Sequence, residues 1–139
     1  MYHLLKTYKR RWDLFELMTL GLDEEKMDYL INEMQLKGHY AHRYPLHFHT
    51  PFRAKSLRTS KILRDISNWL KPQKNQAQRV VILGTTWHWT VIISTDQTRL
   101  YLFDSLGIKS QRKETFSVRP GLKRHTLLPE AIYFVEREF

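Results

Sequence analysis

Apolar side chains recur at helical spacing through the first half of the chain. A period of about 3.6 residues is typical of helices that bury one face. We predict helices over Leu4–Leu20, Asp23–Leu36 and Ser60–Leu70. The second helix begins where Asp23 can cap the first turn, and the third ends before Pro72, which cannot continue a helix.

The second half of the chain has the patterns of β-strands. Its first apolar run has no polar face, as a central strand would have none, and a short polar segment after Ser94 predicts a hairpin. The strands that we expect are Arg79–Leu83, Trp87–Ser94, Leu100–Phe103, Phe116–Arg119 and Ala131–Glu136. Helices followed by a mostly antiparallel sheet predict the α+β class, with the N-terminal helices packed on the sheet.

The hairpin of this sheet is expected to be covered on both faces. Successive side chains of a strand point to opposite faces, and both helices and loops are available as cover. We therefore expect six large side chains to be largely buried: Trp69, Trp89, Val91, Ile93, Tyr101 and Phe103.

Length and composition indicate a single domain over residues 1–139, because 139 residues with 42% hydrophobic side chains suffice for one core. No stretch has the pattern of a signal peptide or a membrane helix, so we expect a cytoplasmic protein with no membrane partner. The chain has no cysteine, which excludes disulfides, thiolate metal sites and a cysteine nucleophile. We expect no cofactor, and the sequence leaves the oligomeric state open.

A histidine and an aspartate stand at corresponding ends of the two hairpin strands. If Ser94 pairs with Thr98 across a short loop, His88 lies directly opposite Asp104 on the same face. An imidazole held by a carboxylate is the orienting part of a nucleophile, base and acid triad. The same two residues could instead cap strand ends with no chemical role.

The residues around this pair resemble a known family. The segment His-Trp-Thr-Val-Ile-Ile, which begins at His88, and the segment Leu-Tyr-Leu-Phe-Asp-Ser-Leu-Gly, which contains Asp104, are similar to the His and Asp strands of papain-like cysteine peptidases. The resemblance is to the bacteriocin-processing type, which removes double-glycine leaders, and its uncharacterised bacterial relatives, and it covers about Arg79 to Arg137. It implies that His88 is the general base, that Asp104 orients it, and that the sheet packs against helices.

The chain departs from this family at the nucleophile. The family has a Cys at the start of its first long helix and a preceding Gln that forms the oxyanion hole, whereas this chain has no Cys and no Gln before Gln35. The hydroxyls of Ser56, Thr59 and Ser60 carry no nucleophile-elbow motif. The sequence therefore favours a pseudopeptidase that binds peptides or proteins around Trp87 and His88 without cleaving them.

Four histidines cluster in an irregular, aromatic-rich segment. They are His39, His42, His47 and His49. Imidazole nitrogens are good zinc ligands, but the spacing fits no standard finger, so packing against the neighbouring aromatic rings is the competing interpretation. We predict no metal site and keep the cluster as an alternative.

The positive charge is concentrated in two segments. The formal net charge is +9, and residues 41–75 and 106–125, with +7 and +5, together carry more than this net charge. Such segments favour acidic partners, so we expect an acidic protein or peptide, with nucleic-acid binding as the alternative function and a solvated basic face as the simplest reading. The candidate binding residues are Arg58, Lys61, Arg64, Lys109, Arg112 and Lys113.

Overall fold

The computed structural model describes residues 23–37, 46–72, 78–86 and 88–137. The chain divides into two compact units, residues 1–46 and 47–139, and each is described by itself. The helix predicted over Leu4–Leu20 lies outside the described residues. The expectation of one domain over the whole chain stays a prediction.

The first unit contributes one described helix, α3 (Glu24–Lys37). It begins as predicted at Asp23, whose Oδ1 accepts the backbone N–H of Lys26 at 2.8 Å. Glu24 and Glu25 follow in the first turn, where carboxylates suit the helix dipole. Its buried side chains recur at helical spacing, as predicted, at Met27, Leu30 and Ile31.

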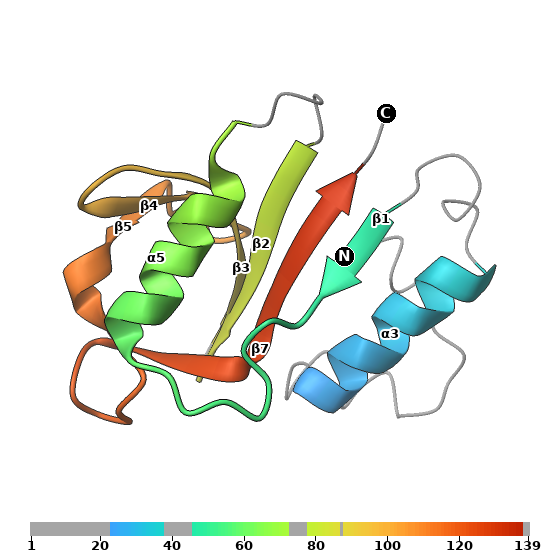
Figure 1. Cartoon of the computed structure of the whole chain (residues 1–139), viewed down its shortest axis with the longest axis horizontal. Helices are drawn as coiled ribbons and strands as arrows, with labels where there is room; N and C mark the ends of the chain where they lie inside the picture. The colour runs from blue at the N-terminus through green and yellow to red at the C-terminus, as the bar shows by residue number, and fades with distance from the viewer. Residues whose placement is uncertain (1–22, 38–45, 73–77, 87, 138–139) are drawn as a thin grey trace. The chain divides into compact units, whose positions relative to one another are not determined.

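The second unit is built on a largely antiparallel sheet with the strand order β1-β7-β2-β3-β4-β5 (Figure 1). The short strand β6 pairs in parallel with the beginning of β7. This mixture of helix and antiparallel sheet confirms the α+β class, and the central position of β2 between β7 and β3 is also confirmed. The strands are β1 (Leu46–His49), β2 (Gln78–Thr85), β3 (Trp89–Thr95), β4 (Arg99–Phe103), β5 (Ser110–Arg112), β6 (Phe116–Ser117) and β7 (His125–Arg137).

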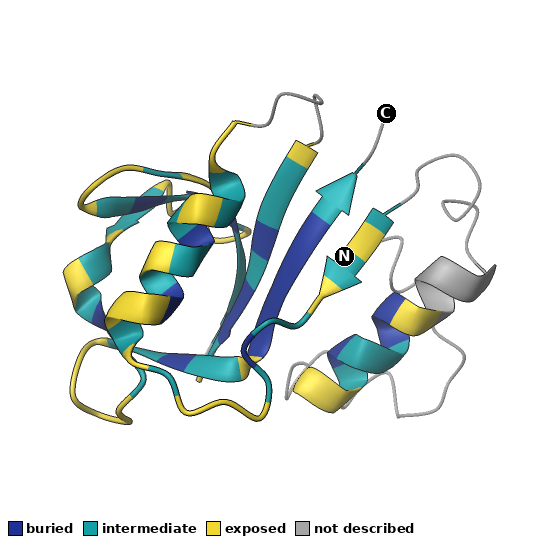
Figure 2. Cartoon of the chain, in the orientation of Figure 1, coloured by how far each residue is buried: buried dark blue, intermediate teal, exposed yellow. Residues whose placement is uncertain are grey.

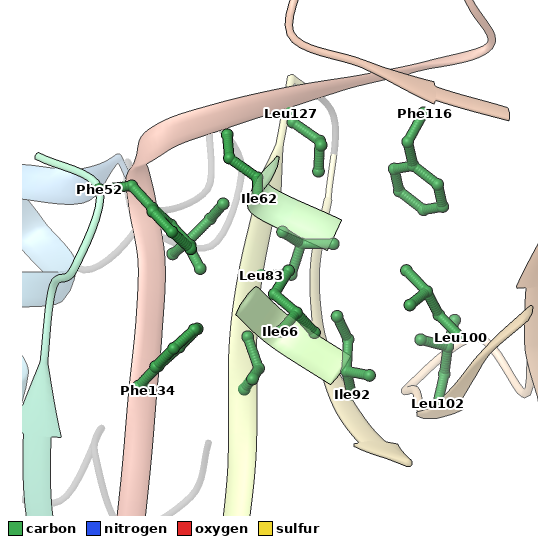
Figure 3. Packing of buried hydrophobic residues seen from close by; sticks show 12 residues of the cluster. Phe52, Ile62, Ile66, Leu83, Ile92, Leu100, Leu102, Phe116, Leu127 and Phe134 are labelled. Atoms are coloured by element: carbon green, nitrogen blue, oxygen red, sulfur yellow. The ribbon is translucent and has the colours of Figure 1, made fainter. Parts of the chain in front are cut away.

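Helix α5 (Thr59–Leu70) covers one face of β2 and β3. Its inner side chains Ile62 and Ile66 are fully buried and belong to the same cluster as Leu83 and Ile92 (Figure 3). Its outer face is exposed, which gives the ribbon alternating colours in Figure 2. No side chain caps the first turn, because the N-cap residue is Arg58, whose guanidinium has no acceptor. The Thr59 hydroxyl accepts the Val118 N–H at 3.0 Å. No helix of the described residues is long and apolar enough to cross a membrane.

A carboxylate organises the turn between β3 and β4. Asp96 accepts the hydroxyl of Tyr101 at 2.6 Å and the backbone N–H groups of Thr98 and Arg99 at 2.9 and 2.7 Å. The Tyr101 hydroxyl, followed by these two N–H groups, lowers the pKa of Asp96 to about 2. The turn is therefore held by an ionised side chain over the whole neutral range.

One extra residue interrupts the pairing of the hairpin strands. Ile92 pairs with Leu102 and Ser94 pairs with Tyr101, which leaves Ile93 without a partner on β4. Side chains of a strand alternate between the two faces of the sheet, and the extra residue shifts this alternation by one position in the part of β3 that follows it. Because of it, both Ile92 and Thr95 face α5, although they are three positions apart.

The predicted register of the hairpin is wrong. We expected Ser94 to pair with Thr98, whereas it pairs with Tyr101. The Asp96 turn accounts for the difference, because its carboxylate binds the backbone of Thr98 and Arg99 inside the connection and the first pair outside it is Thr95 with Leu100.

The predicted burial of the hairpin is wrong at two positions. Ile93 is 48% exposed and Phe103 is 77% exposed. Both lie away from α5, which covers the face that carries Ile92 and Leu102. The other four residues of the prediction, Trp69, Trp89, Val91 and Tyr101, are partly rather than largely buried.

Two segments that looked irregular or short in sequence are strands. β1 spans only four residues, and Leu46 and Phe48 alternate with exposed His47 and His49, so its period is too brief to recognise. β7 is longer than the predicted Ala131–Glu136 and is interrupted, because Leu83 pairs with Ile132 but Thr85 with Leu127.

The residue at this interruption is Pro129, which has no N–H to give to a ladder. The first part of β7 therefore crosses the end of the sheet before the second part pairs along β2 (Figure 1). This bend brings His125 and Thr126 to the end of the sheet where β3 begins and β4 ends.

We expect deletion of Ile93 to leave the fold intact. Removal of the unpaired residue makes the ladder regular and keeps the pairs on both sides, so the free energy of unfolding should change by less than about 1 kcal/mol. Thermal unfolding followed by circular dichroism measures this. Deletion of Leu102, which is paired and buried, serves as the control and should abolish cooperative unfolding. Loss of cooperative unfolding on deletion of Ile93 would show that the bulge itself is required.

Candidate functional site

The structure brings His88 and Asp104 into contact at one end of the hairpin. The distance from His88 Nε2 to Asp104 Oδ1 is 2.6 Å. The Asp104 side chain is 1% exposed and that of His88 is 33% exposed. The contact predicted from the sequence is confirmed, but the two residues face each other diagonally, because the bulge at Ile93 and the longer connection change the register.

Asp104 is held as a carboxylate in spite of its burial. Burial raises the pKa of Asp104, but the Thr90 hydroxyl, the His88 imidazole and the Leu106 N–H together lower it by more. Its Oδ2 accepts that N–H at 2.9 Å. The buried Oγ1 of Thr90 lies outside hydrogen-bonding geometry to every described group, so it acts on Asp104 as a nearby dipole.

This charge sets the orientation of the imidazole. An ionised Asp104 can only accept a hydrogen bond, so Nε2–H of His88 is the donor and Nδ1 of the neutral ring is an acceptor. The backbone holds the same residue, since the His88 carbonyl accepts the N–H of Thr85 at 2.8 Å and its hydroxyl at 3.2 Å. The arrangement has the geometry of an oriented base.

A pocket of about 300 Å³ lies beside the pair. It is hollowed between the end of the hairpin, the loop that follows β4 and the beginning of β7. Its walls are mostly apolar, and its polar groups include hydroxyls, an amide and a guanidinium. The lining residues are Leu83, Thr85, Thr86, His88, Thr90, Leu102, Asp104, Leu106, Ile108, Gln111, Phe116, Arg124, His125 and Thr126.

A second histidine, His125, also lines the pocket. Burial, followed by the charge of Arg124, lowers the pKa of His125. Its ring packs on that of Phe116, with centroids 4.9 Å apart. His125 is therefore a neutral part of the wall at pH 7.

The basic residues predicted for binding do not line this pocket. Arg58, Lys61 and Arg64 lie at the start and on the exposed side of α5, where Lys61 pairs with Asp65 at 2.7 Å. Exposed Lys109 follows the β4 loop, and Arg112 contacts Glu114 at 3.3 Å.

Lys113 begins the short 3-10 helix η1 (Lys113–Thr115), and its Nζ donates to Ser67 Oγ on α5 at 3.1 Å. This bond places the second basic segment against the helix that carries the first. Trp87 lies outside the described residues.

The hydroxyls that could substitute for the missing thiol are not among the pocket residues. Ser56, Thr59 and Ser60 do not line the pocket. The residues that sequence reasoning missed are Gln111, Arg124 and Thr126. Gln111 and Arg124 lie in the segment that was visible only as a basic stretch, and Thr126 follows it. Their placement depends on β5 and on the bend of β7, which leave no periodic signal.

The histidine cluster is divided by the fold. His47 and His49 lie on β1 and are exposed, and the ring of His49 meets that of Trp69 edge-on at 5.9 Å. His39 and His42 lie outside the described residues. Among the described residues no group of three or more metal-ligating side chains converges.

Comparisons with protein-family models, with curated proteins and with solved structures found no match. The site therefore has to be interpreted from its own chemistry.

We expect Asp104 to titrate below the usual range of an aspartate, and its midpoint to rise in His88→Ala. The imidazole lowers the pKa of Asp104 through a hydrogen bond and through its charge, whereas burial raises it. Without the imidazole, fewer groups oppose the effect of burial, so the pKa rises. Carboxyl carbon chemical shifts measure both midpoints. Because a lowered pKa stabilises the folded state above the unfolded-state value and is lost as the pH falls, the variant should also lose less stability on acidification.

Asp96 provides the internal control for this titration. Its hydrogen-bond partners lie in the connection and in the first residues of β4, and none of them is His88, so its midpoint near pH 2 should be the same in both proteins. An Asp104 midpoint that does not move when His88 is replaced would contradict the assigned interaction.

Proposed function

We propose that this chain is a non-catalytic peptide- or protein-binding module related to papain-like cysteine peptidases, and that it binds in the pocket beside His88. The observation that carries the proposal is the 2.6 Å contact between His88 and a carboxylate that is 1% exposed, at the wall of an open pocket. A buried carboxylate is costly unless it is paired. A pair maintained at a pocket wall is better suited to a ligand than to stability alone.

The absence of the family's cysteine nucleophile argues against peptide cleavage. The chain has no cysteine. Two of the four threonine hydroxyls that line the described pocket are engaged or buried, because that of Thr85 is bonded to the His88 carbonyl and that of Thr90 is buried beside Asp104. An oriented base without an attacking thiolate lacks one of the largest contributors to acyl transfer in this family.

The same groups are suited to binding a peptide. Nδ1 of a neutral His88 accepts a hydrogen bond, the amide of Gln111 both donates and accepts, and apolar walls desolvate a side chain. A pocket with mostly apolar walls and a few fixed polar groups is the usual form of a ligand site. The tautomer of His88 that Asp104 selects favours a ligand N–H or O–H donor.

The charge of the chain points to an acidic protein or peptide as the partner. Lys113 joins the second basic segment to α5, so basic side chains from both segments lie on neighbouring surfaces. The same surface favours nucleic acid as the second candidate. The two are separated by salt, because phosphate neutralisation makes affinity fall steeply and linearly with log salt concentration.

The peptide proposal is tested by selection from a random dodecapeptide library and by anisotropy of the labelled consensus peptide. Leu106→Glu should weaken binding at least about tenfold, which corresponds to about 1.4 kcal/mol, because it places a charge in an apolar wall. Leu122→Glu is the matched control, since Leu122 is also exposed, at 58%, but does not line the pocket.

Three outcomes would overturn the proposal. The library could yield no consensus, the two leucine variants could bind equally, or the peptide could be cleaved in a reaction that His88→Ala abolishes. Salt-steep binding of single-stranded or duplex nucleic acid, without a peptide consensus, would support the second candidate instead.

We expect the double variant Arg58→Glu and Arg64→Glu to slow association of an acidic consensus peptide several-fold at low salt. Within the described residues neither side chain has an acidic partner, so the change acts on the long-range field and leaves the fold intact. Stopped-flow association at two salt concentrations measures it. Lys61→Glu is less suitable, because it would add repulsion with Asp65. An unchanged association rate would show that this surface does not attract the partner.

A further inference from the structure

The two charged side chains of the pocket differ in their partners among the described residues. Asp104 is its one carboxylate among the described lining residues, and its two oxygens are already bonded to His88 and to the Leu106 N–H. Arg124 also lines the pocket, is exposed, and has no acidic partner in the part of the chain that the structure describes. The site therefore offers a cation to a ligand and no free acid.

The neighbouring histidine indicates that the charge of Arg124 acts on this wall. Arg124 is the second cause, after burial, that keeps the adjacent His125 neutral. The wall thus has one fixed positive charge that a ligand can reach, next to a ring that does not add a second. A guanidinium with free donors binds carboxylates in a planar, two-bonded geometry.

The floor of the pocket is apolar and belongs to the core. Leu83, Leu102 and Phe116 line it and are 0%, 8% and 4% exposed. Figure 3 shows Phe116 facing Leu100 and Leu102 across this part of the core. A side chain that enters would lose water on several sides, and a volume of about 300 Å³ suits one or two residues rather than a long segment.

We propose that the pocket captures the free C-terminus of a peptide whose last side chain is apolar. The terminal carboxylate binds Arg124, and the last side chain lies on the floor formed by Leu83, Leu102 and Phe116. This assignment rests on the proposed peptide-binding function and adds which end of the peptide is bound. A carboxylate could also come from an internal Asp or Glu side chain, but such a residue brings no apolar group for the floor.

The probe is a set of fluorescein-labelled pentapeptides with a common Gly-Ser body. Members end in leucine, phenylalanine, serine or aspartate, and each is made with a free carboxylate and as the amide. Anisotropy titrations with the full-length protein should give at least about tenfold tighter binding of the free acid than of the amide for leucine and phenylalanine, since a charged hydrogen-bonded pair is lost in the amide. The serine peptide should bind more weakly.

Two matched variants identify the cation. Arg124→Gln should reduce the difference between acid and amide to less than about twofold, whereas Lys123→Gln, with the same loss of charge one residue earlier and outside the pocket, should retain it. Circular dichroism verifies that both variants are folded. The comparison of acid with amide on the wild-type protein does not depend on either variant.

The outcomes separate this inference from the proposal on which it rests. Equal binding of acids and amides, or an unchanged preference in Arg124→Gln, would overturn the inference while leaving peptide binding in place. Tight binding of the aspartate amide would assign the carboxylate to a side chain and would also overturn it. Failure of every peptide in the set and of the random library to bind would overturn both.

Discussion

The buried carboxylate of Asp104 is the constraint on which the site depends. An ion that is 1% exposed has to be satisfied by charge, by hydrogen bonds or by both. His88 and the Leu106 N–H supply the bonds, and each is itself held by backbone, the first through Thr85 and the second through the turn after β4. The end of the hairpin, its loop and the pocket wall are therefore positioned by one charge.

Because Asp104 has to meet His88, the site depends more on the register of the hairpin than on the length of its strands. Next to the turn, Thr95 pairs with Leu100. If this register continued without the bulge, Asp104 would lie opposite an odd-numbered residue of β3. The side chain of His88, at an even-numbered position, would then point to the other face of the sheet. The extra residue at Ile93 restores the alternation, so that Asp104 is level with Thr90 and on the face of His88. A bulge next to a functional site commonly re-aims a side chain in this way.

Hydrophobic period was sufficient to predict α3 and α5, because each is long enough to repeat its pattern, and a continuous apolar run was sufficient to predict the central strand β2. It could not predict β1, which has four residues, or the exposed positions of Ile93 and Phe103, which depend on the face that α5 covers. The contact of His88 with Asp104 was predicted from the alternation of side chains along the two hairpin strands, although the register assumed for this pairing was wrong. Arg124 and Gln111 could not be assigned to the pocket, because their placement depends on the bend of β7 and on β5, which carry no periodic signal.

The outermost strand on the hairpin side of the sheet has a consequence for how the protein behaves in concentrated solution. An open strand edge presents unpaired backbone groups on which another chain can assemble, and exposed apolar side chains such as Phe103 add to that hazard. β5 has only three residues, ends in the exposed guanidinium of Arg112, and is preceded by exposed Lys109. A short edge flanked by cations is a poor template, so two copies that approach along it repel each other before their backbones can pair. These cations thus protect the open edge of the sheet from aggregation.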